Sequence, residues 1–274
     1  RPGMAQPTGL IRAKNIILDR RESLTFCPVY KSASTSWSIN LMQLRGVWEE
    51  GVLVQPRMHD TFAWIANSAA PIVTQNTTRF MIVRHPFERL LSCYRDKFEG
   101  AKKDYYYVKY GQKMVRMYRN VYVTREEKEA MLNEIEHLVV SHKKLYLPNN
   151  PYASPPGPTF SEFVSYITTV RHDDEHWRPM HQHCSPCNIN YNFIIRFENL
   201  QTESYNFIEY LNRTEQIKPR WDNPTKGGVT TTAVACSYFS QLTSEMVDKL
   251  VDKYRKDFEL FQYSPSDYMK CSQH

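Results

Sequence analysis

Two stretches of the chain repeat the same pattern of apolar and polar positions. Residues 23–30 form a short apolar run rich in β-prone side chains, and apolar residues at helical spacing follow over residues 37–44. Residues 80–83 form a second apolar run, and Pro86 is well placed as the first residue of the helix that follows it. Each stretch therefore predicts a strand, a short polar loop and a helix.

The remaining apolar runs predict more helices and one more strand. A charged helix is expected over residues 126–142, a proline-rich loop over 146–158 and a helix over 160–170. Residues 191–197 predict a third strand, and the apolar stripe over residues 247–258 predicts an amphipathic helix that packs on the core. Strands that alternate with helices predict a single α/β domain with a central parallel sheet flanked by helices, and its ligands are expected at the carboxyl ends of the strands.

The composition is that of an ordinary globular protein. Of the 274 residues, 41% are hydrophobic and 23% are charged, which supplies a sizeable core and excludes a disordered chain. The sequence has no run of eighteen or more apolar residues, and residues 1–10 lack the apolar stretch of a signal peptide. We therefore expect that this sequence neither spans a membrane nor carries its own export signal.

Positive charge is concentrated in one segment of the chain. The 35 Lys and Arg exceed the 29 Asp and Glu, for a net charge of +6, and residues 95–128 hold ten of these cations against five acidic residues. Six tyrosines lie among the ten cations, an arrangement that suits sugar rings or bases. A solvated helical face would explain the same pattern equally well.

The number of cysteines does not distinguish a reducing from an oxidising compartment, whereas two N-glycosylation sequons favour an oxidising one. Six cysteines fit either compartment, whereas Asn76 and Asn212 begin tripeptides that accept N-glycans. Cys184 and Cys187, with three histidines nearby, have the spacing of half a zinc site, but no second half follows at the spacing of a zinc finger. We therefore expect no metal, and a disulfide or a buried thiol at these cysteines.

The two strand-to-helix loops have the chemistry of an anion site. The first loop carries Lys31 at the start of a helix, where backbone N–H groups and the helix dipole attract anions. It is not a Walker A loop, because the lysine precedes the small residues, and an ordinary helix cap is the alternative. The second loop offers Arg84, and Ser92 follows two helical turns later. Two such sites on neighbouring strand ends indicate one ligand with phosphates at both ends. Hydroxyl groups in the first loop come from Ser32, Ser34, Thr35 and Ser36.

Four segments together resemble a known family. Residues 27–37 (CPVYKSASTSW) and 80–98 (FMIVRHPFERLLSCYRDKF) are similar to the two sulfonate-donor motifs of the Golgi carbohydrate sulfotransferases. The similarity is to the group that holds the chondroitin and dermatan 4-O-sulfotransferases. Residues 175–200 and 257–268 resemble two further blocks of that group. The resemblance implies a P-loop-like sulfotransferase fold.

The resemblance also implies a sulfuryl donor, 3'-phosphoadenosine 5'-phosphosulfate, which leaves as 3',5'-ADP. Lys31, with the loop from Ser34 to Ser36, matches the family's 5'-phosphosulfate site, and Arg84 and Ser92 match its 3'-phosphate site. One position departs from the family, because His85 stands where an acidic residue is usual. This departure affects how the 3'-phosphate arginine is oriented without removing it. The expected donor-binding set also includes Ser32, Trp37 and Lys226.

Transfer of the sulfuryl group also needs a base. An in-line displacement requires that the acceptor oxygen is positioned, that its proton is removed and that charge on the leaving phosphate is stabilised. Lys31 and backbone amides suit the leaving side, and a histidine is the best base near neutral pH. His59 resembles a family histidine between the two donor loops, which is the base in related heparan 2-O-sulfotransferases. His176, in the HWRP block, is the second candidate.

The expected acceptor is an anionic glycan of the chondroitin or dermatan type. The resemblance further implies a disulfide-containing glycoprotein of the Golgi lumen, and a single-pass type II membrane protein whose anchor precedes Arg1. Residues 1–22 would then be a stem remnant and residues 23–274 the catalytic domain. The basic segment would meet the glycan through Lys102, Lys103, Lys109 and Arg116.

Other functions fit part of the sequence. A relative that binds the nucleotide or the glycan without transfer would share the fold, although Lys31, Arg84, Ser92 and both histidines are in place. A phosphotransferase would need acidic residues that hold Mg²⁺ beside the phosphate loop, and no such aspartate ends the run over residues 80–83. Nucleic-acid binding by the basic segment fits its charge but none of the other motifs.

Overall fold

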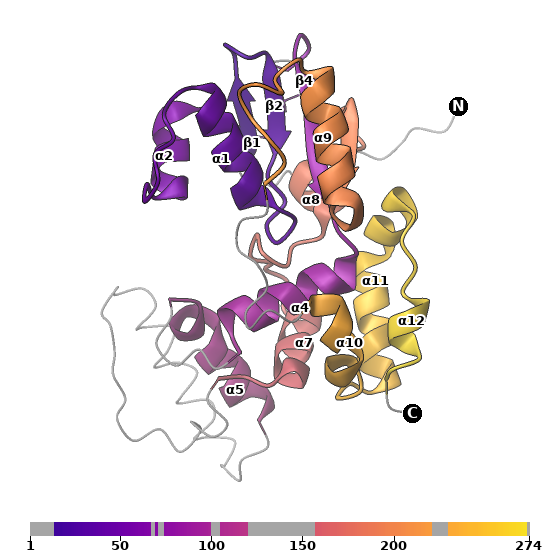
Figure 1. Cartoon of the computed structure of the whole chain (residues 1–274). Coiled ribbons are helices and arrows are strands. Elements are labelled where there is room, and N and C mark those ends of the chain that lie inside the picture. The colour runs from indigo at the N-terminus through magenta and orange to yellow at the C-terminus, as the bar shows by residue number, and fades with distance from the viewer. Residues whose placement is uncertain are drawn as a thin grey trace. The chain divides into compact units, whose positions relative to one another are not determined.

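A computed structural model describes residues 14–66, 69–70, 74–99, 105–119, 157–220 and 230–272 (Figure 1). These residues fall into two compact units. The first unit spans Arg1–His85 and Arg178–Pro224, and the second spans Pro86–Trp177 and Thr225–His274. Among the described residues, no helix has both the length and the apolar character needed to cross a bilayer.

The first unit is built on a five-stranded sheet with the order β3-β1-β2-β4-β5. Its strands β2 (Leu24–Cys27), β4 (Thr78–Val83) and β5 (Phe193–Arg196) are parallel, as the sequence predicts. Strand β1 (Lys14–Asp19) pairs antiparallel with both β2 and β3 (Ala63–Ala66). The expected α/β class is therefore confirmed, but the sheet is mixed and not wholly parallel.

A tight hairpin explains the antiparallel half of the sheet. Only four residues separate β1 from β2, and so short a connection can join only antiparallel strands. The side chain of Asp19 accepts hydrogen bonds from the backbone N–H groups of Arg21 (3.0 Å) and Glu22 (3.2 Å), and Ser23 adopts a left-handed conformation (φ 52°). Residues 14–19 therefore belong to the sheet and residues 20–22 to its hairpin turn, although the sequence places them in a stem ahead of residue 23.

Aromatic side chains join the helices of the first unit to its sheet. Trp37 of α1 (Ser34–Leu44) and Phe207 of α9 (Leu200–Tyr210) both contact Phe80 of β4, with ring centroids 4.9 and 4.6 Å away. Because one side chain meets both helices, α1 and α9 cover the same face of the sheet. The unit also contains α2 (Val54–Thr61), α8 (Met180–Cys184) and the short η2 (Phe197–Asn199).

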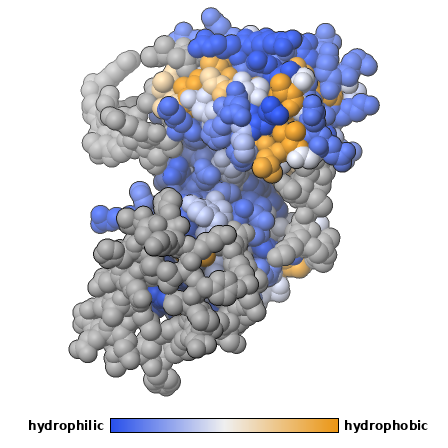
Figure 2. All heavy atoms as spheres, turned by 90° about the vertical axis from the view of Figure 1, so that its left-hand side faces the viewer, coloured by the Kyte–Doolittle hydropathy of each residue, from blue (hydrophilic) through white to orange (hydrophobic). Residues whose placement is uncertain are grey.

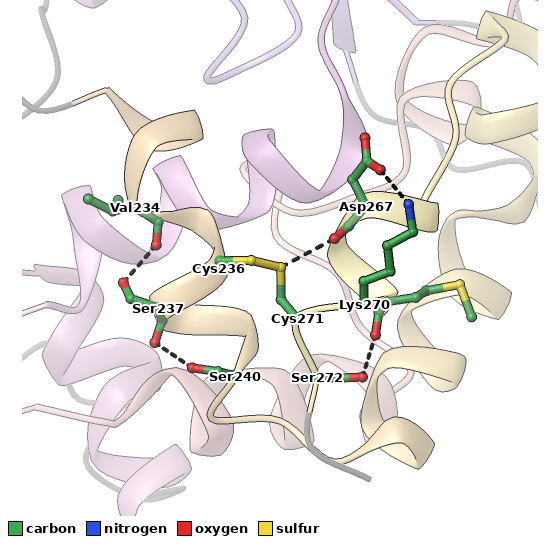
Figure 3. The surroundings of a disulfide bond; sticks show 9 residues. Val234, Cys236, Ser237, Ser240, Asp267, Lys270, Cys271 and Ser272 are labelled. Carbon is green, nitrogen blue, oxygen red and sulfur yellow. Dashed lines mark hydrogen bonds and ion pairs between the residues drawn. A yellow bond between two sulfur atoms is a disulfide. The ribbon is translucent and has the colours of Figure 1, made fainter.

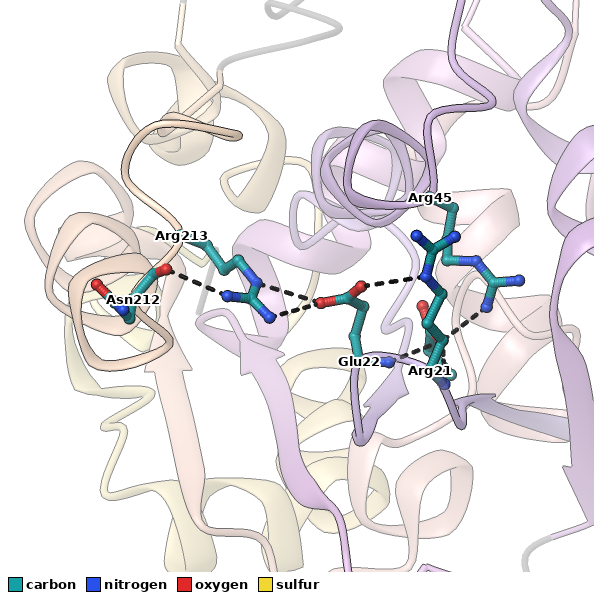
Figure 4. A network of polar contacts seen from close by, with 6 residues as sticks. Arg21, Glu22, Arg45, Asn212 and Arg213 are labelled. Carbon is teal, nitrogen blue, oxygen red and sulfur yellow. Dashed lines mark hydrogen bonds and ion pairs between the residues drawn. The ribbon is translucent and has the colours of Figure 1, made fainter.

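Ion pairs fasten the β1–β2 hairpin to the helices around it (Figure 4). Glu22 accepts two hydrogen bonds from the guanidinium of Arg213, which follows α9, at 3.0 and 3.2 Å. Arg45, at the end of α1, donates to Asp19 at 2.8 Å. The carboxylate of Asp19 is almost completely buried, so this contact also neutralises a buried charge.

The described part of the second unit is helical and has an aromatic core. Phe87 of α4 lies 5.1 Å from the rings of both Phe239 and Phe258, and Phe98 lies 5.2 Å from Phe163. The predicted helix over residues 160–170 and the predicted amphipathic helix are both present, whereas residues 126–142 lie outside the described residues. The helices are α4 (Pro86–Lys97), η1 (Tyr107–Gly111), α5 (Gln112–Tyr118), α7 (Phe160–Thr169), α10 (Thr231–Phe239), α11 (Ser244–Phe261) and α12 (Ser266–Met269).

Each unit contains one disulfide. Cys27 and Cys184 are joined in the first unit, with a sequence separation of 157 residues. Cys236 of α10 is joined to Cys271, just after α12, across 35 residues in the second unit (Figure 3). The expected disulfides are thus confirmed.

Candidate functional site

The loop that carries Lys31 leaves the sheet at the end of β2 and enters α1. Lys31 (φ 69°) and Ala33 (φ 55°) are both in the left-handed region, which is unfavourable for residues other than glycine. The N–H of Ser32, between them, donates to the carbonyl of Val29 at 3.1 Å. Strained backbone of this kind clusters at ligand-binding loops, so the conformation itself marks the loop as a candidate site.

The start of α1 has the properties of an anion site. Ala33 occupies the N-cap position and has no polar side chain with which to cap the helix. The hydroxyl of Ser32 is fully buried and has no hydrogen-bond partner among the described residues. Backbone N–H groups at an eleven-residue helix, together with this hydroxyl, are donors that suit a phosphate or a sulfate.

Arg84 joins the second loop to the first. It follows the last residue of β4, and its Nη1 donates to the carbonyl of Lys31 at 3.1 Å. Its guanidinium also stacks on the ring of Phe197, 4.2 Å from the centroid. Because β2 and β4 are parallel neighbours, both loops leave the same edge of the sheet, as the sequence predicts. The structure therefore brings the guanidinium of Arg84 to the backbone of Lys31 at this edge.

A glutamate from another segment lies beside the second loop. The backbone N–H of His85 donates to Oε1 of Glu198, in η2, at 2.7 Å. His85 is the position where the resembling family usually has an acidic residue. A carboxylate is thus present next to Arg84, although it comes from residue 198, which sequence reasoning did not single out.

Three other predicted donor-binding residues have different surroundings. Trp37 is buried in the core, where its indole N–H donates to Ser204 at 3.3 Å, so its side chain supports α1 and is not exposed to a ligand. Ser92 lies partly buried on α4, in the second unit. Lys226 lies outside the described residues.

The cysteine pair considered for zinc is divided between a disulfide and a free thiol. Cys184 is bonded to Cys27, at the end of β2, whereas Cys187 is free and exposed. The sulfur atoms of Cys27 and Cys184 lie within 4.8 Å of a ring nitrogen of His183, but disulfide sulfurs are not thiolate ligands. The ring of His183 instead donates from Nε2 to the carbonyl of Pro28 at 3.1 Å.

The first candidate base, His59, lies on a polar helix of the first unit. It is exposed near the end of α2, and its ring stacks on Trp64 with centroids 4.3 Å apart. The indole N–H of Trp64 donates to the carbonyl of Met58 at 3.3 Å, which holds the stacking partner in place. Figure 2 shows hydrophobic residues as separate patches among hydrophilic ones on this side of the molecule. The imidazole of His59 is therefore oriented and accessible to solvent.

The second candidate base, His176, is buried in a polar cluster of the second unit. Its Nδ1 lies 2.8 Å from Oδ1 of Asp174 and 3.0 Å from the hydroxyl of Tyr106, while Tyr110 donates to Oδ2 of Asp174 at 3.0 Å. Burial raises the pKa of the Asp174 carboxyl, but hydrogen bonds from His176 and Tyr110 outweigh it and hold that pKa below its usual value. Burial raises the pKa of Tyr110 to about 12.

Part of the basic segment is packed on aromatic rings, buried or paired with acidic residues. Lys109 lies near the rings of Tyr105 and Tyr110, with Nζ 5.2 and 4.9 Å from their centroids, and Arg116 is buried, so it offers little surface to a glycan. Lys102 and Lys103 lie outside the described residues. Three other cations of the segment have acidic partners, in the pairs Arg95–Glu99, Lys97–Asp96 and Arg119–Glu162.

Both predicted glycosylation sites lie at the surface of the first unit. Asn76 is exposed in the turn before β4, and Asn212 is exposed directly after α9, with φ 54°. A glycan chain could be attached at either position without disturbing the core.

Comparison with known proteins decides the family. The model of the sulfotransferase family matches residues 14–264. The chain belongs to the sulfotransferase family. The predicted enzyme class is thereby confirmed, and the match begins at β1, in keeping with the place of that strand in the sheet.

Several proteins that are similar to this chain are named carbohydrate sulfotransferases. Carbohydrate sulfotransferase 11 of Mus musculus is 25% identical over 271 residues, which cover 94% of this chain and 69% of that protein. Carbohydrate sulfotransferase 8 of Homo sapiens is 27% identical over 264 residues, which cover 91% and 55%. Carbohydrate sulfotransferase 14 of Danio rerio is 25% identical over 260 residues, which cover 91% and 62%. No solved structure matches the chain.

Proposed function

We propose that this sulfotransferase transfers a sulfuryl group from 3'-phosphoadenosine 5'-phosphosulfate to a hydroxyl of a sugar. The observation that carries the proposal is the hydrogen bond from Arg84 to the carbonyl of Lys31, because it joins the two basic loops at the carboxyl edge of the parallel strands. A nucleotide with an anionic group at each end needs a cation for each of them. The names of the similar proteins support a carbohydrate acceptor.

The residues of the first unit would share the work of donor binding. Lys31, the buried hydroxyl of Ser32 and the start of α1 would hold the 5'-phosphosulfate, and Arg84 would hold the 3'-phosphate. As the sugar oxygen bonds to sulfur, the bond from sulfur to the 5'-phosphate oxygen breaks, and Lys31 stabilises the charge that develops on that phosphate. The roles of Ser92 and Lys226 stay predictions.

We assign the base to His59. The acceptor hydroxyl must lose its proton as its oxygen attacks sulfur, and an imidazole can take that proton near neutral pH. His59 belongs to the same unit as Lys31 and Arg84, is exposed, and is oriented by Trp64. His176 is the second candidate, because its ring is oriented by Asp174, 2.8 Å from Nδ1.

The acceptor we propose is an anionic glycan of the chondroitin or dermatan type, bound with the help of Lys109. A basic residue held between aromatic rings suits a sugar with a carboxylate or a sulfate. Two disulfides and two exposed sequons support an oxidising compartment, for which we propose the Golgi lumen.

A transfer assay with acceptors of different kinds tests the proposal. Donor carrying radiolabelled sulfate is incubated with the protein and with desulfated chondroitin, dermatan, heparosan or simple glycosides, and the labelled products are cut to disaccharides. We expect label on chondroitin-type or dermatan-type chains. Nucleotide binding without transfer to any sugar would instead identify a binding protein of the same fold, and absence of nucleotide binding would refute the donor site.

A further inference from the structure

The loop that carries Lys31 is held at its start by α8, a helix more than 150 residues further along the chain. Cys27, the last residue of β2, is bonded to Cys184, and the neighbouring His183 donates from Nε2 to the carbonyl of Pro28 at 3.1 Å. The side-chain amide of Asn15, on β1, donates in turn to the carbonyl of His183. A covalent bond and a hydrogen bond thus meet at two consecutive residues of the loop.

The same loop is held at Lys31 by Arg84. The carbonyl of Pro28 accepts from His183 and the carbonyl of Lys31 accepts from Arg84, so the two intervening peptide units are fixed at both ends. Between the two anchors lies the backbone with a left-handed Lys31. Such a conformation persists only where the surroundings impose it, and the contacts at Pro28 and Lys31 are those surroundings.

The Cys27–Cys184 disulfide and the hydrogen bond from His183 to Pro28 form a clamp on the start of the loop, and this clamp lies in the interior of the unit. Cys27 and Cys184 are fully buried, and only 2% of His183 is exposed. Removing a buried ring that donates to a carbonyl costs free energy, because the carbonyl is then left in the interior without a partner. The clamp therefore favours one geometry at the start of the loop.

We propose that His183, together with the Cys27–Cys184 disulfide, is a positioning residue that preorganises the Lys31 loop for the 5' end of the donor. The inference rests on the proposed function, since it takes the Lys31 loop as the 5'-phosphosulfate site. A loop that is already in its binding conformation loses less entropy when the ligand arrives. His183 thus contributes to donor affinity without touching the donor.

Two amide substitutions separate positioning from general stability. In His183→Gln the side-chain amide nitrogen lies about where Nε2 of the imidazole was, whereas in His183→Asn it is one methylene too short to reach Pro28. The probes are 3',5'-ADP, which has the 5'-phosphate, and adenosine 3'-phosphate, which lacks it. The binding constants of both are measured by titration calorimetry, together with each variant's thermal midpoint.

The expected result is a loss that depends on the 5'-phosphate. His183→Asn should bind 3',5'-ADP roughly five to ten times more weakly, the effect of one net hydrogen bond, with adenosine 3'-phosphate unchanged. His183→Gln should keep the affinity for 3',5'-ADP within about two-fold. The matched control removes the other disulfide through Cys236→Ser and Cys271→Ser, and it should lower the thermal midpoint while leaving both affinities unchanged.

Lys31→Ala separates failure of this inference from failure of the proposed function. If Lys31→Ala weakens 3',5'-ADP but His183→Asn does not, or if His183→Asn weakens both probes equally, the positioning role is refuted and the donor site stands. If Lys31→Ala leaves 3',5'-ADP binding unchanged, the donor site itself is wrong.

Discussion

The buried contacts of the two compact units stabilise different things, a candidate binding loop in the first unit and the packing of helices in the second. In the first unit, a disulfide, a histidine and an arginine all hold the loop that follows β2. In the second unit, the disulfide joins α10 to Cys271 just after α12, and half of the buried core residues are aromatic. The same kind of bond therefore supports a candidate site in one unit and mainly the packing of helices in the other.

The largest expected effect comes from removing the loop's positive charge. Lys31→Ala should lower kcat/KM for sulfate transfer by about a thousand-fold, because it removes donor binding together with stabilisation of the leaving phosphate. The matched control is Lys249→Ala on α11, where an exposed lysine pairs with Glu245 at 2.7 Å. Initial rates with radiolabelled donor give kcat/KM for both variants. An equal loss of kcat/KM in the two would contradict the placement of the donor site in the first unit.

The next effect compares the two candidate bases. His59→Ala should lower kcat by about a hundred-fold or more while affinity for 3',5'-ADP stays nearly unchanged, because a base acts on the acceptor proton and not on the nucleotide. His176→Ala should leave more activity than His59→Ala. The readouts are single-turnover rates and nucleotide titrations. Unchanged turnover in His59→Ala would exclude His59 as the base and leave His176 as the candidate.

A smaller effect concerns the disulfide of the second unit. Replacing Cys236 and Cys271 by serine should lower the free energy of unfolding by about 2–4 kcal/mol, because the unfolded chain gains freedom when its closed loop is opened. The donor KM should stay as in the unsubstituted protein, since both cysteines belong to the second unit whereas Lys31 and Arg84 belong to the first. Denaturant unfolding and donor kinetics together decide the point, and a raised donor KM would show that this bond also serves the site.

The smallest expected effect concerns the stability of the second unit at alkaline pH. Burial raises the pKa of Tyr110, in the second unit, to about 12, above the value of about 10 for an unfolded tyrosine. The folded state therefore holds this proton more tightly, and the stability that results is complete below pH 10 and is lost as the pH rises towards 12. Tyr110→Phe should lose less stability over that range than the unsubstituted protein, as followed by thermal midpoints between pH 8 and 11. An identical pH profile would contradict the assignment.

Local pattern predicted the parts of the fold that depend on neighbouring residues. The strand-loop-helix units around Lys31 and Arg84 were predicted because each combines a β-prone run with helical spacing directly after it. The place of the two loops at one sheet edge followed from parallel pairing. Strand β1 was missed, because its antiparallel partners are set by the turn at Asp19 and by β3, more than forty residues away.

Contacts between distant segments were beyond the reach of sequence patterns. The bond from Cys27 to Cys184 spans 157 residues, and six cysteines allow many pairings, so only the folded chain reveals it. Glu198 beside His85 is likewise a long-range contact. His183, directly before Cys184, is visible in the sequence, where it indicates only a possible metal site. Its hydrogen bond to the carbonyl of Pro28 is a long-range contact that the sequence pattern does not reveal.

The most direct test of the donor site asks whether Lys31 and Arg84 hold opposite ends of one nucleotide. Titration calorimetry measures the affinity of Lys31→Ala and Arg84→Ala for 3',5'-ADP and for adenosine 3'-phosphate. If the site is as proposed, Arg84→Ala weakens both nucleotides, whereas Lys31→Ala weakens 3',5'-ADP and leaves adenosine 3'-phosphate unchanged. If Lys31→Ala weakens both nucleotides equally, or if neither substitution weakens either one, the two loops do not share the donor in this way and the central claim is wrong.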